Sequence, residues 1–513
     1  MRADCREYLD SPLRHYTTMT VRPIHLWNNR RMRIHPVIIQ GGMGAAISDW
    51  RLARAVSSLG QLGVVSGVAL DVILTRRLQD GDPGGNIRQA LDEFPERAIA
   101  DRIRETYYIP GGKAPDAPYK VVPMPSKNSR RDVVELLVVA NFVEVFLARL
   151  GHRNPVGINY LEKVQTSLLP SVYGAMLAGV SYVLMGAGIP IKVPGVLDAL
   201  AKHERASYPL HVTGAEPEDD VLMSFDPKDY IGAELPPLLR PNFLAIVSSN
   251  VLATTMLKRS NGRVDGFVIE GPTAGGHNAP PRGKLQLDES GEAVYGERDR
   301  VDLARIRELG LPFWLAGGYG SATKVHEALD QGAAGVQVGT AFAFCEESGL
   351  REDYKQALLA SARKHDVRVV TDMLASPTNF PFKSAQLAGT VTEDGVYDSR
   401  PRVCDLGYLR EAYRTESGTI AFRCAAEPIT TYVAKHGKVE DTVGKKCLCN
   451  SLLANVGLAQ VRPGNYVEQG FVTAGNQLTE LAEFLPADGL RYTAADVIAA
   501  LLASVHLEPM AAD

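Results

Sequence analysis

The chain has 513 residues, 45% hydrophobic and 22% charged, a composition typical of a soluble globular protein. A net charge of −4 gives no support to nucleic-acid binding or to an anionic membrane surface as partner. No apolar stretch reaches the roughly 20 residues of a membrane span. The N-terminus has charges but lacks the apolar core of a signal peptide. A cytoplasmic protein without nucleic-acid or membrane partners is therefore expected.

Short apolar runs recur from about residue 35 to 345. They lack a clean alternation of apolar and polar residues, as expected for parallel strands covered on both faces. The runs predicted as strands are Val37–Gln40, Leu62–Ser66, Val156–Tyr160, Tyr182–Gly186, Phe243–Ser248, Phe267–Gly271, Phe313–Gly317 and Gly335–Gly339. Eight such strands, alternating with helices, predict an α/β fold of the TIM-type (β/α)8 barrel class. A doubly wound open sheet is the structural alternative.

Helical patterns fall between these strands. They cover Asp49–Leu59, Ser171–Ala178, Val196–His203, Val251–Arg259, Val301–Leu309 and Ala322–Gln331. Asp49, Asn250 and Ser321 or Thr323 are suited to cap helix N-termini, because their side chains can accept backbone N–H bonds. These helices complete the βα units of the predicted barrel.

The predicted barrel occupies residues 1–350 and carries two insertions. Residues 67–155 contain Gly/Pro-rich loops and a long helix at Arg131–Leu150, and residues 206–242 resemble a small β-rich excursion. Such insertions form lids or solvent-exposed decoration. Residues 351–513 are expected to be a helix-rich C-terminal extension or lid. The expected helices are Tyr354–Lys364, Cys449–Val456, Leu478–Phe484 and Ala494–Val505, and the aromatic patch 372–382 either covers the barrel mouth or simply packs.

A glycine pair followed by histidine, Gly275-Gly276-His277, comes shortly after the strand Phe267–Gly271. Glycine lets the backbone approach a ligand closely, because it has no Cβ. Histidine titrates near neutral pH, which suits a general base. A surface histidine in a Gly/Pro-rich turn explains the same residues.

Three more strands end in glycine turns, at Gln40-Gly41-Gly42-Met43, Ala316-Gly317-Gly318 and Gly339-Thr340. In barrels, the loops after the seventh and eighth strands often bind phosphate through backbone N–H groups. The last two turns are one βα unit apart, so they are expected to be adjacent in space. They predict a phosphate site, although glycines also simply close tight turns.

Together these motifs resemble those of the nitronate monooxygenase (2-nitropropane dioxygenase) family, over roughly residues 35–350. They are also similar to flavin-dependent enoyl reductases of fatty-acid and polyketide synthesis. The resemblance implies a barrel that binds FMN without covalent attachment, with His277 as the catalytic histidine. The residues implied in FMN binding are Gly317, Gly318, Gly339 and Thr340 at the phosphate, Gln40, Gly41, Gly42 and Met43 beside the flavin ring, and Asn159, Glu270, Gly275 and Gly276 as further contacts.

The resemblance implies a small-molecule substrate, a nitronate or nitroalkane oxidised with O2. The first alternative is an enoyl reductase in which NAD(P)H reduces FMN, and the second is a phosphometabolite-binding barrel without flavin. Glu270 and Thr273 depart from the family, which usually has Gln and Glu there. Four residues also separate His277 from Arg282-Gly283, where the family continues directly. These departures leave the substrate open, and the sequence also leaves a homo-oligomer open.

Four cysteines, Cys404, Cys424, Cys447 and Cys449, lie in the C-terminal extension. Four thiols could bind zinc or an iron–sulfur cluster. Their spacing fits none of the strong signatures, and isolated cysteines more often behave as small buried apolar residues. No metal site is therefore predicted.

Overall fold

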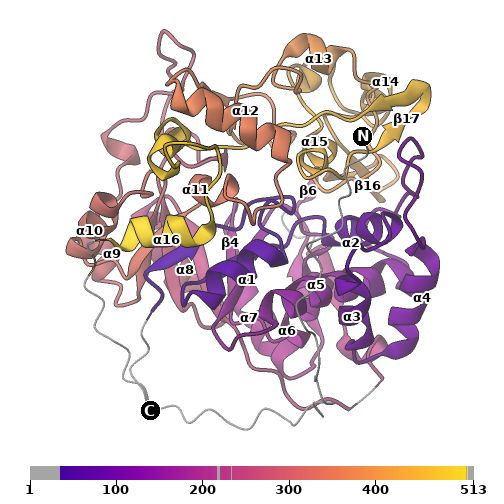
Figure 1. Ribbon diagram of the computed structural model, residues 1–513. Helices are drawn as coiled ribbons and strands as arrows, with labels where there is room; N and C mark the ends of the chain where they lie inside the picture. The colour runs from indigo at the N-terminus through magenta and orange to yellow at the C-terminus, as the bar shows by residue number, and fades with distance from the viewer. Residues whose placement is uncertain (1–34, 217–219, 233, 504, 506–513) are drawn as a thin grey trace, which may run out of the picture. The chain divides into compact units, whose positions relative to one another are not determined.

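Eight parallel strands form the centre of the computed structural model, which describes residues 35–216, 220–232, 234–503 and 505 (Figure 1). The N-terminal residues that lack the apolar core of a signal peptide lie outside the described residues. The strands are β1 (Ile38–Gln40), β2 (Gly63–Ser66), β3 (Val156–Leu161), β4 (Tyr182–Gly186), β8 (Asn242–Val247), β9 (Gly266–Glu270), β11 (Phe313–Ala316) and β12 (Gly335–Val338).

The sheet closes on itself. Each strand pairs in parallel with the next, and β12 lies beside β1. The ring is completed by hydrogen bonds from Gln40 N to the Leu62 carbonyl (2.9 Å) and from Leu62 N to the Ile38 carbonyl (3.0 Å). The predicted TIM-type (β/α)8 barrel is confirmed, and the open sheet is excluded because closure leaves no free edge.

The helices of the barrel follow the strands as predicted. They are α1 (Trp50–Ser58), α6 (Leu168–Leu177), α7 (Val193–Ala201), α8 (Asn250–Arg259), α9 (Leu303–Arg307) and α10 (Ala322–Asp330). Asp49 caps α1 and Ser321 caps α10, through side chains that accept backbone N–H bonds. The predicted cap Asn250 is wrong. Ser249 Oγ accepts the Leu252 N–H at 3.1 Å, and Asn250 instead donates to the Asp302 carbonyl at 2.7 Å.

Both insertions contain regular structure. The first holds α2 (Leu70–Gln79), α3 (Asn86–Asp92), α4 (Arg97–Tyr107) and α5 (Arg131–Arg149), the last being the long helix predicted there. The second holds β5 (Ala206–Pro209), β6 (Val212–Thr213) and β7 (Leu222–Phe225). Among the helices of the described residues, none is both long and apolar enough to span a membrane.

Residues 351–513 contain helices and also strands that the sequence did not predict. The helices are α12 (Glu352–Arg363), α13 (Asp394–Asp398), α14 (Ile429–Ala434), α15 (Leu448–Ala454), α16 (Ala494–Leu502) and the 3-10 helix η5 (Asn476–Phe484). The strands are β13 (Val369–Asp372), β14 (Phe382–Ala385), β15 (Glu411–Arg414), β16 (Ile420–Arg423), β17 (Val461–Arg462) and β18 (Tyr466–Val467).

This C-terminal part packs onto the barrel. From Pro36 onward the chain forms one compact unit. β14 pairs with β10 (Gly276–His277) in the loop after β9, and β15 pairs with β6 of the second insertion. Figure 1 shows α12 to α15, in orange, gathered at one end of the barrel. The C-terminal extension therefore forms small sheets together with strands that lie in the loops of the barrel.

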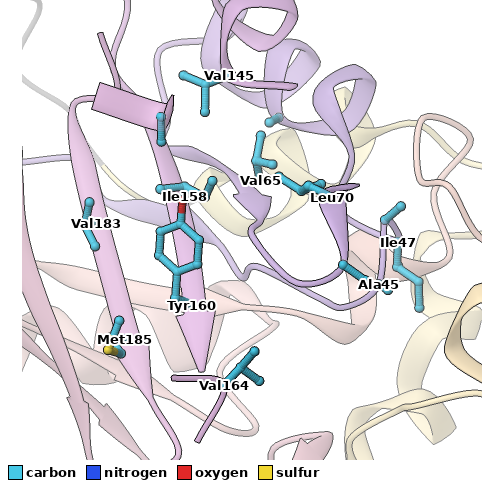
Figure 2. Close-up of a cluster of buried hydrophobic side chains, with 14 of the residues drawn as sticks. Ala45, Ile47, Val65, Leu70, Val145, Ile158, Tyr160, Val164, Val183 and Met185 are labelled. Atoms are coloured by element: carbon cyan, nitrogen blue, oxygen red, sulfur yellow. The ribbon is translucent and has the colours of Figure 1, made fainter. Parts of the chain in front are cut away.

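Strand alternation sorts the barrel side chains into two apolar layers. The interior layer contains Ile39, Val64, Leu184, Leu244, Val268 and Trp314. The outer layer packs against the helices, as Figure 2 shows for Val65, Ile158 and Val183 with Val145 of α5. Gly157 of β3 faces inward, where a Cβ would lie 3.1 Å from Val64 Cγ2 and 3.2 Å from Leu184 Cδ1. Glycine at this position leaves room for both side chains.

Candidate active site

A cavity opens at the carboxyl ends of the barrel strands. Its floor consists of residues that lie two positions beyond the interior apolar layer and so point to the same side of the sheet. Examples are Ser66 after Val64 and Glu270 after Val268. Other lining residues that face inward by the same rule are Gly41, Asn159, Gly186, Ile246, Ala316 and Gln337. Moving along the strands from the apolar interior of the barrel, the first polar side chains that point inward therefore lie in this cavity.

The structure brings the predicted site residues together, with one exception. The residues that line the cavity are Gly41, Gly42, Met43, Asn159, Glu270, Gly275, Gly276, His277, Gly317, Gly318, Gly339 and Thr340. They come from five strand ends, those of β1, β3, β9, β11 and β12, which are far apart in the sequence. The convergence of the glycine turns on one cavity is the arrangement that a single ligand site requires.

Gln40 does not line the cavity, contrary to the prediction. It follows Ile39 of the interior layer by one position, so alternation turns its side chain outward. Its Nε2 donates to Ser48 Oγ at 2.8 Å, and its Oε1 accepts the Val64 N–H at 3.0 Å. Gln40 therefore fixes the loop that carries Gly41 and Gly42 and does not contact a ligand in the cavity.

His277 is held between the barrel and the C-terminal extension. It pairs with Phe382 across β10 and β14, and its ring meets the Phe382 ring edge-on, with 4.9 Å between centroids. Its Nε2 lies 2.7 Å from Ser376 Oγ, which in turn lies 2.8 Å from Thr378 Oγ1. Both the orientation of the imidazole and the hydrogen bonding of one ring nitrogen are thereby fixed.

Asn278 stabilises the loop that presents His277. The residue is buried, and its Nδ2 donates to the Ala274 carbonyl at 2.9 Å and to the Pro272 carbonyl at 3.3 Å. Its backbone N–H donates to the Pro381 carbonyl at 2.9 Å. Asn278 is the first of the four residues between His277 and Arg282. It holds the backbone of the loop that presents His277.

Burial shifts both ionisable groups that characterise the site. Desolvation lowers the pKa of His277 to about 4, so the imidazole is neutral at pH 7. Desolvation also raises the pKa of Glu270 to about 7, so its carboxyl group is largely protonated below neutral pH. In the neutral form Glu270 has the shape and the hydrogen-bonding groups of the glutamine that the resembling family usually carries there.

The shift at Glu270 predicts a pH-dependent effect of Glu270→Gln on stability. Between the ordinary value of 4.5 and about 7, the folded state holds a proton that the unfolded state releases, so wild-type stability falls as pH rises through this window. Glutamine has no charge to desolvate. We expect Glu270→Gln to raise the free energy of unfolding by up to about 3 kcal/mol at pH 8 and to change it little at pH 4.5.

Urea unfolding of ligand-free protein at both pH values measures this difference. Glu289→Gln serves as the matched control, because Glu289 is exposed outside the cavity. An equal gain for Glu270→Gln at pH 4.5 and pH 8 would contradict the assigned desolvation.

The glycine turns after β11 and β12 line the same cavity as His277. Gly317 and Gly318 have φ values of 86° and 80°, in the left-handed region that glycine tolerates. A Cβ at Gly317 would lie 2.9 Å from the Gly271 carbonyl oxygen, so the turn also needs a close backbone approach. No Lys or Arg side chain lies among the described residues of the cavity wall. An anion here would therefore be bound by backbone N–H groups and the Thr340 hydroxyl.

The C-terminal extension forms a wall of the cavity that the motifs did not reveal. Its residues in the lining are Phe382, Tyr408, Leu409, Cys449, Leu452, Thr473, Ala474, Gly475 and Gln477. Gly475 N donates to Thr340 Oγ1 at 3.0 Å, and a Cβ at Gly475 would lie 2.6 Å from the Thr273 carbonyl oxygen. Two further lining residues of the barrel, Ser66 and Gln337, were also missed. Strand alternation, continued to the ends of β2 and β12, would have identified both as inward-facing.

The floor of the cavity contains an acceptor without a partner. Gln337 Oε1 is buried and makes no hydrogen bond with the described residues. An unpaired buried acceptor costs free energy unless a ligand donates to it. Gly42 lies close by, packed so tightly that a Cβ would stand 2.3 Å from Asn159 Cβ. The cavity thus offers a flat, glycine-lined surface and a polar floor, which suit a planar ligand with N–H donors and a phosphate.

Part of the chain matches the model of a known family. Residues 242–377 match the family model described as nitronate monooxygenase. This segment runs from β8 into the C-terminal extension and contains His277, Ser376 and the glycine turns after β11 and β12. The resemblance predicted from the motifs is confirmed for this segment.

The individual relatives align with short stretches of this chain. A nitronate monooxygenase of Pseudomonas aeruginosa is 39% identical over 94 residues, which are 18% of this chain and 25% of the relative. A probable nitronate monooxygenase of Bacillus subtilis is 33% identical over 126 residues, which are 25% of this chain and 34% of the relative. The chain therefore aligns with about a quarter to a third of the length of these relatives. The solved structure of FabK from Thermotoga maritima covers 92% of both chains, with 17% identity and a TM-score of 0.43.

Proposed function

We propose that this chain, whose residues 242–377 match the nitronate monooxygenase family, is an FMN-dependent oxidoreductase that oxidises a nitronate or nitroalkane-like substrate with O2. The observation that carries the proposal is the position of His277. Its neutral imidazole lines the cavity, is oriented by Ser376, and belongs to the matched segment. An oriented neutral imidazole is suited to take a proton from a weakly acidic carbon.

The cavity residues fit FMN. Gly317, Gly318, Gly339 and Thr340 would hold the phosphate through backbone N–H groups and a hydroxyl. Gly41, Gly42, Met43 and Asn159 would lie along the flavin ring, and the unpaired Gln337 Oε1 would accept one of its N–H groups. FMN, when bound, supplies the redox chemistry by carrying electrons from substrate to O2.

His277 would act as the base. Ser376 can donate its O–H to Thr378 Oγ1 and accept the Nε2–H of His277, an arrangement that leaves Nδ1 unprotonated. Among the described residues no hydrogen bond engages Nδ1. That nitrogen can therefore accept a proton from the carbon next to the nitro group, and the resulting imidazolium stabilises the nitronate anion.

Glu270 fits the same proposal. A permanent carboxylate on the cavity floor would repel an anionic nitronate. With a pKa raised to about 7 by burial, the group is neutral over part of the working range and can donate a hydrogen bond. The substrate is therefore expected to bind more tightly below pH 7 than above it.

The proposal is tested by supplying an alkyl nitronate to the holoenzyme. In air, we expect O2 consumption and nitrite release that depend on the nitronate. Without oxygen, the nitronate is expected to bleach the flavin absorbance, whereas NADPH leaves it unchanged. Rapid bleaching by NADPH and none by nitronate would contradict the proposal and favour the enoyl reductase alternative.

A further inference from the structure

Four cysteines from three separate segments of the C-terminal extension surround a second, small cavity. Cys404 lies in the loop after α13, Cys424 follows β16, and Cys447 and Cys449 flank the start of α15. All four thiols are free. The remaining wall is mostly apolar and includes Pro377, Leu406, Leu409, Ala426 and Leu448.

We propose that Cys404, Cys424, Cys447 and Cys449 bind an iron–sulfur cluster in this cavity. Four cysteine thiolates are the usual ligand set of such clusters, and they need not follow one another at a fixed short spacing when the fold brings them together. This inference departs from the expectation of no metal site, which rested on spacing along the sequence.

The arrangement favours a cluster over a single zinc ion. Structural zinc needs four ligand atoms about 2.0–2.3 Å from one point. Among the described residues no group of three or more His, Cys, Asp or Glu side chains is placed to hold a single metal ion. The four cysteines nevertheless all line the same small cavity. Sulfurs distributed around a void suit a group that contains several metal atoms.

One hydrogen-bond donor already points at a sulfur. Asn450 Nδ2 donates to Cys447 Sγ at 3.5 Å. Such an N–H···S bond stabilises a thiolate and tunes the potential of a cluster that the thiolate binds.

One arginine lies near the cysteines and would offset part of the negative charge that four thiolates bring. Arg410 interacts electrostatically with Cys404, Cys424 and Cys449. The charge of Arg400 is already paired with Glu468 at 2.6 Å, but its buried Nη1 makes no hydrogen bond with the described residues and could donate to an acceptor.

The cluster site adjoins the larger cavity. Cys449 and Leu409 line both cavities, so the two cavities share part of a wall. A group bound by Cys449 would therefore also hold in place the wall that Tyr408 and Leu409 contribute to the candidate active site. Iron–sulfur ligation thus gives the C-terminal extension a role in the site of the barrel.

The experiment uses the full chain without a tag, produced in iron-replete cells and purified without oxygen. Iron, acid-labile sulfide and zinc are measured per chain, and the dithionite-reduced protein is examined by electron paramagnetic resonance. We expect iron and sulfide in equal amounts and a reduced-cluster signal. Zinc in their place, a Cys404–Cys424 disulfide, or absence of iron and sulfide even after anaerobic incubation with ferrous iron and sulfide would each overturn the proposal.

Variants locate the cluster. Cys424→Ser and Cys447→Ser are expected to lose iron and sulfide. Cys345→Ser is the matched control, since Cys345 is also buried and free but lies outside the small cavity. The proposal is overturned if Cys345→Ser loses as much iron as the other variants, or if both others keep the wild-type content. Metal content of the wild type decides the question even where a variant fails to fold.

Discussion

Replacement of His277 by alanine is expected to lower turnover of a neutral nitroalkane by roughly 10²- to 10⁴-fold while bound FMN is retained. The loss follows from removal of the only imidazole in the cavity wall formed by the described residues. FMN should remain, because the residues proposed to hold its phosphate, Gly317, Gly318, Gly339 and Thr340, lie on other loops. Steady-state kinetics, together with flavin absorbance of the purified variant, measures both effects.

Two companion variants separate chemistry from structure. His211→Ala, an exposed histidine outside the cavity, should keep wild-type turnover. Ser376→Ala removes the hydrogen bond to Nε2 and is expected to lower turnover by roughly five- to tenfold, as the loss of about 1 kcal/mol of orientation implies. Wild-type turnover in His277→Ala on every accepted substrate would show that the assigned role is wrong.

The pH dependence of kcat/KM is a second measurement of the role of His277 as a base. Because burial lowers the pKa of His277 to about 4, the acid limb of kcat/KM should lie nearer pH 4 than pH 6.5. The sign follows from the role of a base, which works only when unprotonated. The limb should disappear in His277→Ala.

Replacement of Gly317 by alanine is expected to lower the affinity for FMN by at least about tenfold. The residue has a φ of 86°, and a Cβ would lie 2.9 Å from the Gly271 carbonyl oxygen and 3.2 Å from Thr273 Oγ1. The turn must therefore move, which displaces the N–H groups proposed to bind the phosphate. Equilibrium dialysis of FMN against the variant and the wild type measures the change.

Gly310→Ala is the matched control for Gly317→Ala. Gly310 also has a positive φ, 71°, but a Cβ there would meet no atom within 4 Å. It should cost about 1–2 kcal/mol of stability from backbone strain and leave FMN binding unchanged. Equal FMN loss in both variants would mean that strain alone, and not the phosphate turn, explains the effect.

The barrel could be predicted from the sequence because each strand is a continuous apolar run followed by a helical pattern. At Gln40 the sequence does not show on which side of the sheet the side chain lies. In a three-residue strand buried on both faces, nothing in the composition of Ile38, Ile39 and Gln40 reveals which side chain points inward. The glycine motif therefore predicted that Gln40 contacts the ligand, whereas in the structure its side chain bonds to Ser48 and Val64 and fixes the loop.

The C-terminal wall could not be predicted because it depends on contacts between distant residues. Ser376 is 99 residues from His277, and Gly475 is 135 residues from Thr340. The strands that create these contacts are too short for alternation to be visible. The cysteines illustrate the same limit, since isolated positions in the sequence meet only after β15, β16 and α15 have packed.

The most direct test is to heat the purified wild-type protein and identify and quantify the small molecule that it releases. The convergence of four glycine turns on one cavity predicts FMN, at about one per chain for a single site. A colourless protein that releases no flavin, or releases a different phosphorylated compound, would contradict a flavin site and favour a phosphometabolite-binding barrel.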